Sequence, residues 1–224
     1  GAFTIGTTEF SPMGFLPEIA NDLSVSIPQA GLLISAYAVG VMIGAPLMTL
    51  WLARFPKKTA LILLMAIFTI GNVLATVAPD YMSLMGARLI TSLNHGAFFG
   101  LGSVVAASVV PKDKQASAVA MMFMGLTIAN IGGVPLATWL SQNTSWRMAF
   151  AAISILGIMT MLALWKALPQ DHDVVKPNVA KELRVLTRAP VVLALLTTVM
   201  SAGAMFALYT YIAPSLHVFM QASP

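Results

Sequence analysis

Residues 23–53 read LSVSIPQAGLLISAYAVGVMIGAPLMTLWLA, a stretch of 31 residues without a charged side chain. A bilayer hydrocarbon core about 30 Å thick requires about 20 apolar residues in one helix. Further uncharged runs of comparable length occupy 59–79, 89–111, 115–146, 148–165 and 189–224. Together with the opening stretch 1–17, these runs predict seven membrane-spanning helices.

The composition of the chain excludes a soluble globular protein. Hydrophobic residues make up 58% of the chain and charged residues only 9%, whereas soluble domains carry about 25% charged residues. The runs lack the polar faces of a soluble helical core, and they are too long for the strands of a barrel, which cross the membrane in about 10 residues. The absence of cysteine excludes disulfides, thiol catalysis and cysteine metal sites. The sequence predicts an all-α membrane protein.

The distribution of charge orients the helices. Ten of the twelve Lys and Arg residues fall in alternate loops or at their edges, namely Arg54, Lys57, Lys58, Lys112, Lys114, Lys166, Lys176, Lys181, Arg184 and Arg188. Basic loops stay in the cytoplasm, so this side is the predicted cytoplasmic one. The net charge of +4 is therefore a signal of topology, and nucleic acid is not an expected partner.

The order of the runs predicts three regions. Residues 1–168 form a bundle with helices at about 1–20, 29–53, 57–78, 81–109, 115–140 and 146–168. Residues 169–189 form a cytoplasmic linker, in which 178–188 is predicted to be an amphipathic helix at the interface. Residues 190–224 hold helix 7, at about 190–214. Because the chain starts within helix 1 without Met, that helix is expected to be truncated and the second bundle incomplete.

A short internal similarity supports two inverted three-helix repeats. Residues 43–49 (IGAPLMT) resemble 131–138 (IGGVPLAT), and each segment is followed by Trp-Leu, at 51–52 and 139–140. The first segment runs inward and the second outward, as inverted repeats require.

Three ionisable residues lie inside predicted spans, where such groups are costly and mark functional sites. At 1.5 Å per residue, Glu9 lies roughly 16 Å, Arg88 roughly 11 Å and His95 roughly 21 Å below the outer ends of their helices. Glu9 is thus placed to pair with Arg88 or to exchange protons with His95. The alternatives are that Arg88 reaches the interface and that His95 only bonds a neighbouring helix.

Other polar and small residues indicate a cavity and a bend. A predicted solute cavity is lined by Thr8, Tyr37, Asn94, Asn130 and Tyr209, the alternative being hydrogen bonds between helices. A kink in the fifth helix is predicted at Gly132, Gly133 and Pro135, either as a gating bend or as a static packing feature. The pairs Gly40/Gly44 and Gly96/Gly100 have the spacing of close helix contacts. No nucleotide loop, metal-binding cluster or catalytic triad is present, so neither an enzyme nor a cofactor is predicted.

These motifs together resemble the major facilitator superfamily, and within it the bacterial twelve-helix drug:proton antiporters of the sugar-efflux (arabinose-efflux-like) branch. The matching residues are Gly6-Thr7-Thr8-Glu9-Phe10, Gly14, Leu16-Pro17, Ala36-Tyr37-Ala38, Gly44-Ala45-Pro46, Arg88, Asn94-His95-Gly96-Ala97-Phe98-Phe99-Gly100, Gly125, Asn130, Gly133, Pro135, Trp146-Arg147, Phe150, Tyr209-Thr210-Tyr211 and Pro214.

The resemblance implies two six-helix bundles that transport a solute by alternating access, with Glu9 as a coupling carboxylate and Arg88 as the proton-transfer arginine of the fourth helix. Arg54, Lys57 and Lys58 form the cytoplasmic loop motif. That loop lacks the acidic residue and the glycine usual in the family, so the latch that those residues form between bundles is not expected here.

The expected function is proton-coupled efflux of a sugar or a small amphipathic, drug-like solute, across a bacterial inner membrane. The proton gradient replaces a cofactor. The expected partners are the solute, protons, the lipid bilayer and the missing C-terminal helices of the same transporter. A proton-independent facilitator and a non-transporting receptor or scaffold remain as alternatives.

Overall fold

The computed structural model describes residues 1–169 and 188–220, which are helical throughout apart from short turns. The residues divide into two compact units, 1–174 and 175–224, and each is described by itself. The second unit contains α11 (Ala189–Met220), a single apolar helix of 32 residues. The predicted linker helix at 178–188 lies outside the described residues except for its last residue.

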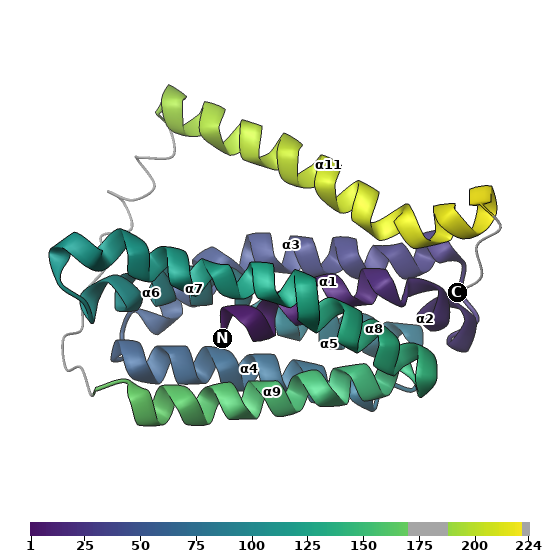
Figure 1. Ribbon diagram of the computed structural model, residues 1–224, viewed down its shortest axis with the longest axis horizontal. Helices are drawn as coiled ribbons and strands as arrows, with labels where there is room; N and C mark the ends of the chain where they lie inside the picture. Colours follow the sequence, from purple (N-terminus) through teal and green to yellow (C-terminus); the bar gives the residue numbers. More distant parts are fainter. Residues whose placement is uncertain (170–187, 221–224) are drawn as a thin grey trace. The chain divides into compact units, whose positions relative to one another are not determined.

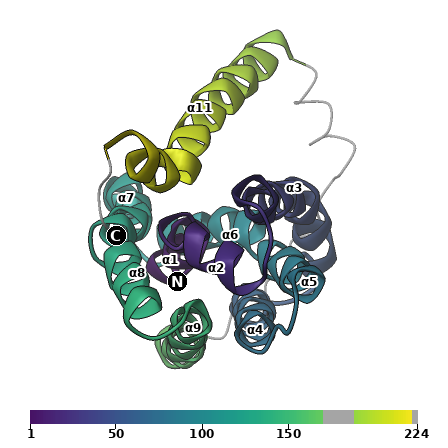
Figure 2. The same cartoon turned by 90° about the vertical axis from the view of Figure 1, so that its right-hand side faces the viewer.

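The first unit is the predicted six-span bundle (Figures 1 and 2). Its helices are α1 (Ala2–Gly14), α2 (Leu16–Asp22), α3 (Ile27–Leu52), α4 (Lys57–Thr76), α5 (Tyr81–Ser92), α6 (His95–Ser108), α7 (Gln115–Ile128), α8 (Val134–Asn143) and α9 (Trp146–Ala167), with a 3₁₀ turn η1 (Lys112–Lys114) and a π-helical turn η2 (Ala129–Gly133). Six spans among the described residues are long and apolar enough to cross a membrane, five of them here and one in α11.

The first, fourth and fifth predicted helices are interrupted, which the hydropathy pattern did not indicate. The first breaks at Phe15, between α1 and α2, where Pro17 occupies the first turn of α2 and has no N–H to donate to the preceding turn. The fourth breaks at Leu93 and Asn94, whose N–H groups reach back three residues instead of four. Because the first break leaves two helices of only 13 and 7 residues, that span is too short to count among the six.

The fifth helix changes its winding at η2. The N–H of Val134 donates to the carbonyl of Ala129, five residues back, and Pro135 follows in the first turn of α8. A proline has no N–H to donate to the preceding turn. The wider turn therefore lies where the α-helical series of hydrogen bonds would in any case be interrupted. The predicted kink at Gly132, Gly133 and Pro135 therefore takes the form of a π-helical turn.

Glycines allow the helices to approach closely. In lipid the hydrophobic effect does not drive helices together, so their association depends on close packing. A Cβ atom added at Gly71 of α4 would overlap Thr91 of α5, and one at Gly157 of α9 would overlap Thr69 of α4. The predicted contacts at Gly40, Gly44 and Gly96 are confirmed as well. Gly100 differs, because nothing lies within 4 Å of its added Cβ.

The inverted repeat is visible in equivalent contacts of the two halves. The first span contacts the fifth through Gly6 with Ala129 and through Thr7 with Gly133. The fourth span contacts the second in the same way, through Ser92 with Gly40 and through Leu93 with Gly44. Equivalent residues of the first and fourth spans are 86 positions apart, and those of the second and fifth are 89 apart. The short sequence similarity thus reflects a real repeat.

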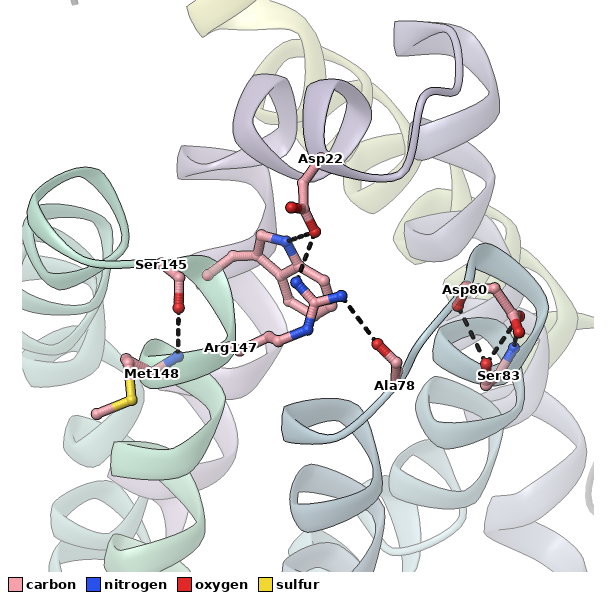
Figure 3. Close-up of polar contacts among 8 residues, drawn as sticks. Asp22, Ala78, Asp80, Ser83, Ser145, Arg147 and Met148 are labelled. Atoms are coloured by element: carbon pink, nitrogen blue, oxygen red, sulfur yellow. Dashed lines mark hydrogen bonds and ion pairs between the residues drawn. The ribbon is translucent and has the colours of Figure 1, made fainter.

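An ionic cluster ties together the outer end of the bundle, the end opposite Lys57 and Lys58 (Figure 3). Arg147 of α9 donates one hydrogen bond to the Asp22 carboxylate, at 2.5 Å, and another to the carbonyl of Ala78, at 2.9 Å. Trp146 donates its indole N–H to the same Asp22 oxygen, at 3.0 Å. The cluster therefore joins the ends of the first, third and sixth spans.

The turn between α2 and α3 contains a strained residue. The N–H of Ser24 donates to the carbonyl of Asn21, and the N–H of Val25 donates to that of Ala20, which is the Schellman pattern at a helix C-terminus. Its left-handed position is normally a glycine, but here Ser24 has a φ of 53°.

Replacing Ser24 by glycine is expected to stabilise the protein by about 1 kcal/mol, because glycine adopts positive φ without the steric cost of a Cβ atom. The measurement is the thermal unfolding midpoint of the complete protein in detergent. Ser24→Ala, which keeps the Cβ atom, is the control and is expected to leave the midpoint unchanged. A decrease in the midpoint for Ser24→Gly would contradict the assignment of strain.

Asp22→Asn is expected to lower the free energy of unfolding by up to about 1 kcal/mol, since the side chain of Asp22 is 47% exposed and such pairs are weak. The hydrogen bonds from Arg147 and then Trp146 lower the pKa of Asp22 below its ordinary value of 3.8. The stabilisation is therefore complete above pH 3.8 and is lost as the pH falls through the lower, folded-state pKa.

The measurement is the difference between the unfolding midpoints of wild type and Asp22→Asn as a function of pH. The difference should be constant near neutral pH and vanish in acid. Asp113→Asn provides a matched control, since the described residues give Asp113 no hydrogen bond or ion pair. A difference that persists unchanged at low pH would show that Asp22 acts through something other than its charge.

Candidate functional site

A layer of polar side chains crosses the middle of the bundle, between two apolar clusters. The cluster near Lys57 and Lys58 includes Ile5 and Phe68. The outer cluster includes Phe15 and Phe150. The polar residues lie between the clusters along each helix, and those that are fully or almost fully buried include Thr8, Asn72, Arg88, Thr91, Ser92 and Asn94.

Glu9 and His95 face each other within this layer. Oε2 of Glu9, on α1, lies 3.8 Å from Nε2 of His95, the first residue of α6. Both side chains are about 15% exposed, at 14% and 15%. The 86 positions that separate equivalent residues of the two repeats also separate Glu9 from His95. The acid and the base therefore occupy the same place in the two halves of the bundle.

Arg88 is buried one helix earlier in the fourth span, with 1% of its surface exposed. Its Nη1 donates to the carbonyl of Thr8 at 3.0 Å, and its guanidinium carbon lies 4.2 Å from the centre of the Tyr37 ring. A charge removed from water is costly unless neighbouring groups offset it. Arg88 is not at the interface, so the alternative that its side chain snorkels to the membrane surface is wrong.

Tyr37 connects Arg88 to His95. Its hydroxyl lies 3.0 Å from Nδ1 of His95, and its ring stands edge-on to the imidazole. Phe99, one turn further along α6, also packs against His95, at a centroid distance of 5.1 Å. The sequence indicated none of the partners of Tyr37, because they depend on how α3 is rotated. The spacing of four residues between His95 and Phe99 was a usable signal for that contact.

The other residues predicted to line a cavity are dispersed. Thr8 is buried and donates to Oδ1 of Asn72 at 2.7 Å. Asn94 is buried at the break in the fourth span, and neither side-chain polar atom has a hydrogen-bond partner among the described residues. Asn130 donates to the carbonyl of Leu126 in its own helix, and Tyr209 belongs to α11 in the second unit. Their role in solute binding stays a prediction.

The residues of the π-helical turn differ in their surroundings. Gly133 lies against Thr7 and the ring of Phe3 on α1, whereas nothing lies within 4 Å of an added Cβ at Gly132. Close packing therefore explains Gly133 and not Gly132. Whether the bend also gates transport stays a prediction.

The predicted loop motif lies at the opposite end of the bundle from Asp22. The guanidinium carbon of Arg54 lies 5.2 Å from the centre of the Trp51 ring and 5.4 Å from that of Phe55. Lys58 donates to the carbonyl of Leu168 at 2.6 Å, joining the third span to the end of the sixth. Lys57 begins α4.

In the part of the chain that the structure describes, no His, Asp and Glu side chains group as metal ligands would.

The family is decided by comparison with known sequences. The model of the Major Facilitator Superfamily matches residues 1–223. The chain belongs to that superfamily. It is 66% identical over its full length to the "Inner membrane transport protein YdhP" of Escherichia coli (strain K12), of which it spans 58%. It is 30% identical, again over its full length, to the "Probable sugar efflux transporter" of Helicobacter pylori (strain P12), of which it spans 57%.

A solved superfamily structure has the same fold. A bacterial homologue of the human lysosomal transporter Spinster, in an inward-facing and unoccupied conformation, aligns with a TM-score of 0.77 at 18% identity. The alignment covers 99% of this chain and 55% of the homologue. The chain thus shares the fold of this transporter, and it spans a little over half the length of these three proteins.

Gly133→Ala is expected to destabilise the complete protein by about 1–3 kcal/mol, because the added Cβ would overlap Thr7 and force the first and fifth spans apart. Gly132→Ala is the matched control. With no atom within 4 Å, it should leave stability unchanged or raise it by about 0.5–1 kcal/mol. The measurement is the thermal unfolding midpoint of each variant, and equal destabilisation by both would contradict the packing difference.

Proposed function

We propose that the protein containing this chain is a secondary transporter of the bacterial inner membrane that exchanges protons for a small organic solute. Membership of the superfamily supports transport by alternating access. The observation that carries proton coupling is the Glu9–His95 pair, whose oxygen and nitrogen are 3.8 Å apart in the polar layer of a membrane bundle.

The depth of Glu9 within its span favours a role in proton transfer. Ionisable groups within spans are costly and tend to mark ion or proton pathways. Glu9 is 14% exposed on its side chain, so a proton can reach it, and its short stem cannot carry the charge to the interface. Glu9 is the proposed proton carrier, His95 its partner, and Arg88 a fixed positive charge beside them.

The proposed solute is a sugar or a small amphipathic compound. The sugar class is supported by the name of the Helicobacter pylori relative, a probable sugar efflux transporter, and the resemblance to drug:proton antiporters supports the amphipathic class. Thr8, Tyr37 and Asn94 are buried within the bundle, so solute contact would require them to become accessible in another conformation. Asn130 and Tyr209 are the proposed cavity residues that are already partly or largely exposed.

The experiment uses the complete protein in proteoliposomes with an imposed pH gradient, and a radiolabelled pentose and ethidium as the two probes. Flux of at least one probe should follow the gradient. Glu9→Gln should abolish the gradient-driven part, because an amide cannot take up a proton. Glu18→Gln, the same substitution near the outer end of the same span, is the control and should retain it.

Two outcomes would contradict the proposal. Flux that is independent of the gradient and unchanged by Glu9→Gln would assign a proton-independent facilitator. Absence of flux for both probes, with the protein shown to be folded, would contradict the proposed solute classes.

A further inference from the structure

The Tyr37 hydroxyl and the Glu9 carboxylate approach different nitrogens of the His95 ring. The hydroxyl lies 3.0 Å from Nδ1, while Nε2 faces Glu9 at 3.8 Å. Tyr37 comes from α3, whereas Glu9 and His95 belong to α1 and α6. Three different spans therefore determine the surroundings of the two ring nitrogens.

These surroundings favour one form of the imidazole. A neutral imidazole carries one N–H donor and one acceptor nitrogen. An ionised carboxylate only accepts hydrogen bonds, whereas a phenol can also donate. With the proton on Nε2, the ring offers a donor to Glu9 and an acceptor to Tyr37, and both contacts are favourable. With the proton on Nδ1, the lone pair of Nε2 would face the lone pairs of the carboxylate.

Arg88 strengthens the same preference. Its guanidinium carbon lies 4.2 Å from the centre of the Tyr37 ring, over the face of the phenol. A nearby positive charge draws electron density from the ring and makes the hydroxyl a better donor than acceptor. In the described part of the bundle, the ionisable groups around His95 are Glu9 from α1, Tyr37 from α3 and Arg88 from α5.

We propose that Tyr37 is a positioning residue, which fixes neutral His95 as its Nε2–H tautomer and thereby directs a hydrogen-bond donor at the Glu9 carboxylate. His95 then holds the deprotonated form of Glu9 and is not itself the second proton carrier. When Glu9 takes up a proton it loses its negative charge, so the charge-assisted attraction of the Nε2–H is reduced to that of a neutral carbonyl oxygen, and the weaker contact makes it easier for the two helices to separate. The importance of this arrangement for coupling rests on the proposed function, but the tautomer itself does not.

The tautomer can be measured directly by nuclear magnetic resonance of the complete protein, labelled with ¹⁵N-histidine and held in lipid nanodiscs near neutral pH. The His95 signal is identified by its loss in His95→Asn. The wild type is expected to show the Nε2–H tautomer. In Tyr37→Phe the ratio of Nε2–H to Nδ1–H should fall by roughly three- to tenfold, the effect of losing one hydrogen bond.

Tyr81→Phe is the matched control. It also removes a tyrosine hydroxyl, one that donates to the carbonyl of Gln29 at 2.8 Å near the outer end of the bundle, and should leave the His95 signal unchanged. Tyr37→Phe keeps the aromatic ring over Arg88, so the variant should fold. If it does not, the wild-type spectrum alone decides the tautomer.

The proposal is overturned if wild-type His95 is Nδ1–H or doubly protonated, or if Tyr37→Phe leaves the ratio unchanged. Failure of the proposed function would look different. In that case the proteoliposomes would show no proton-driven flux, while the tautomer and its dependence on Tyr37 would still be seen.

Discussion

Helices surrounded by lipid gain nothing from hiding their apolar side chains from one another, so close approach of their backbones must hold the bundle together. Here that approach occurs at glycines. Gly6 and Gly133 bring the first span to the fifth, and Gly40 and Gly44 bring the second to the fourth. The polar layer depends on these contacts, because they set the depth and rotation of the helices that carry Glu9, Tyr37 and His95.

Much of the fold followed from the sequence because the bilayer imposes a length on every span and a side on every basic loop. The depth calculation also placed Glu9 within reach of His95, which the structure confirms as neighbours at 3.8 Å. Rotation about a helix axis was harder to predict. When a helix is apolar on all sides, its sequence does not show which side faces the rest of the bundle. Tyr37 was therefore predicted to line a cavity, whereas the structure buries it between Arg88 and His95.

The helix interruptions had unequal signals in the sequence. Pro17 and Pro135 mark two of them, since each removes an N–H donor, although a proline alone does not determine whether a helix bends, breaks or widens. The break at Leu93 and Asn94 has no such marker. Irregular backbone in a membrane is tolerated only where protein or water surrounds it, and Asn94 is fully buried. Two of the irregular spans, the first and the fourth, carry the acid and the base of the polar layer, Glu9 and His95.

The equal spacing of the two repeats has a consequence for charge. A residue near the axis that relates two inverted repeats meets its own counterpart, as residues do across a two-fold interface. If the repeats were identical at this place, Glu9 would face a second carboxylate, and two such groups in close contact cannot both stay ionised. The chain instead has an acid in one repeat and an imidazole in the other. The symmetry of the backbone brings the two equivalent positions together. Because one holds the acid Glu9 and the other the base His95, a proton has different affinities for the two sides of the contact.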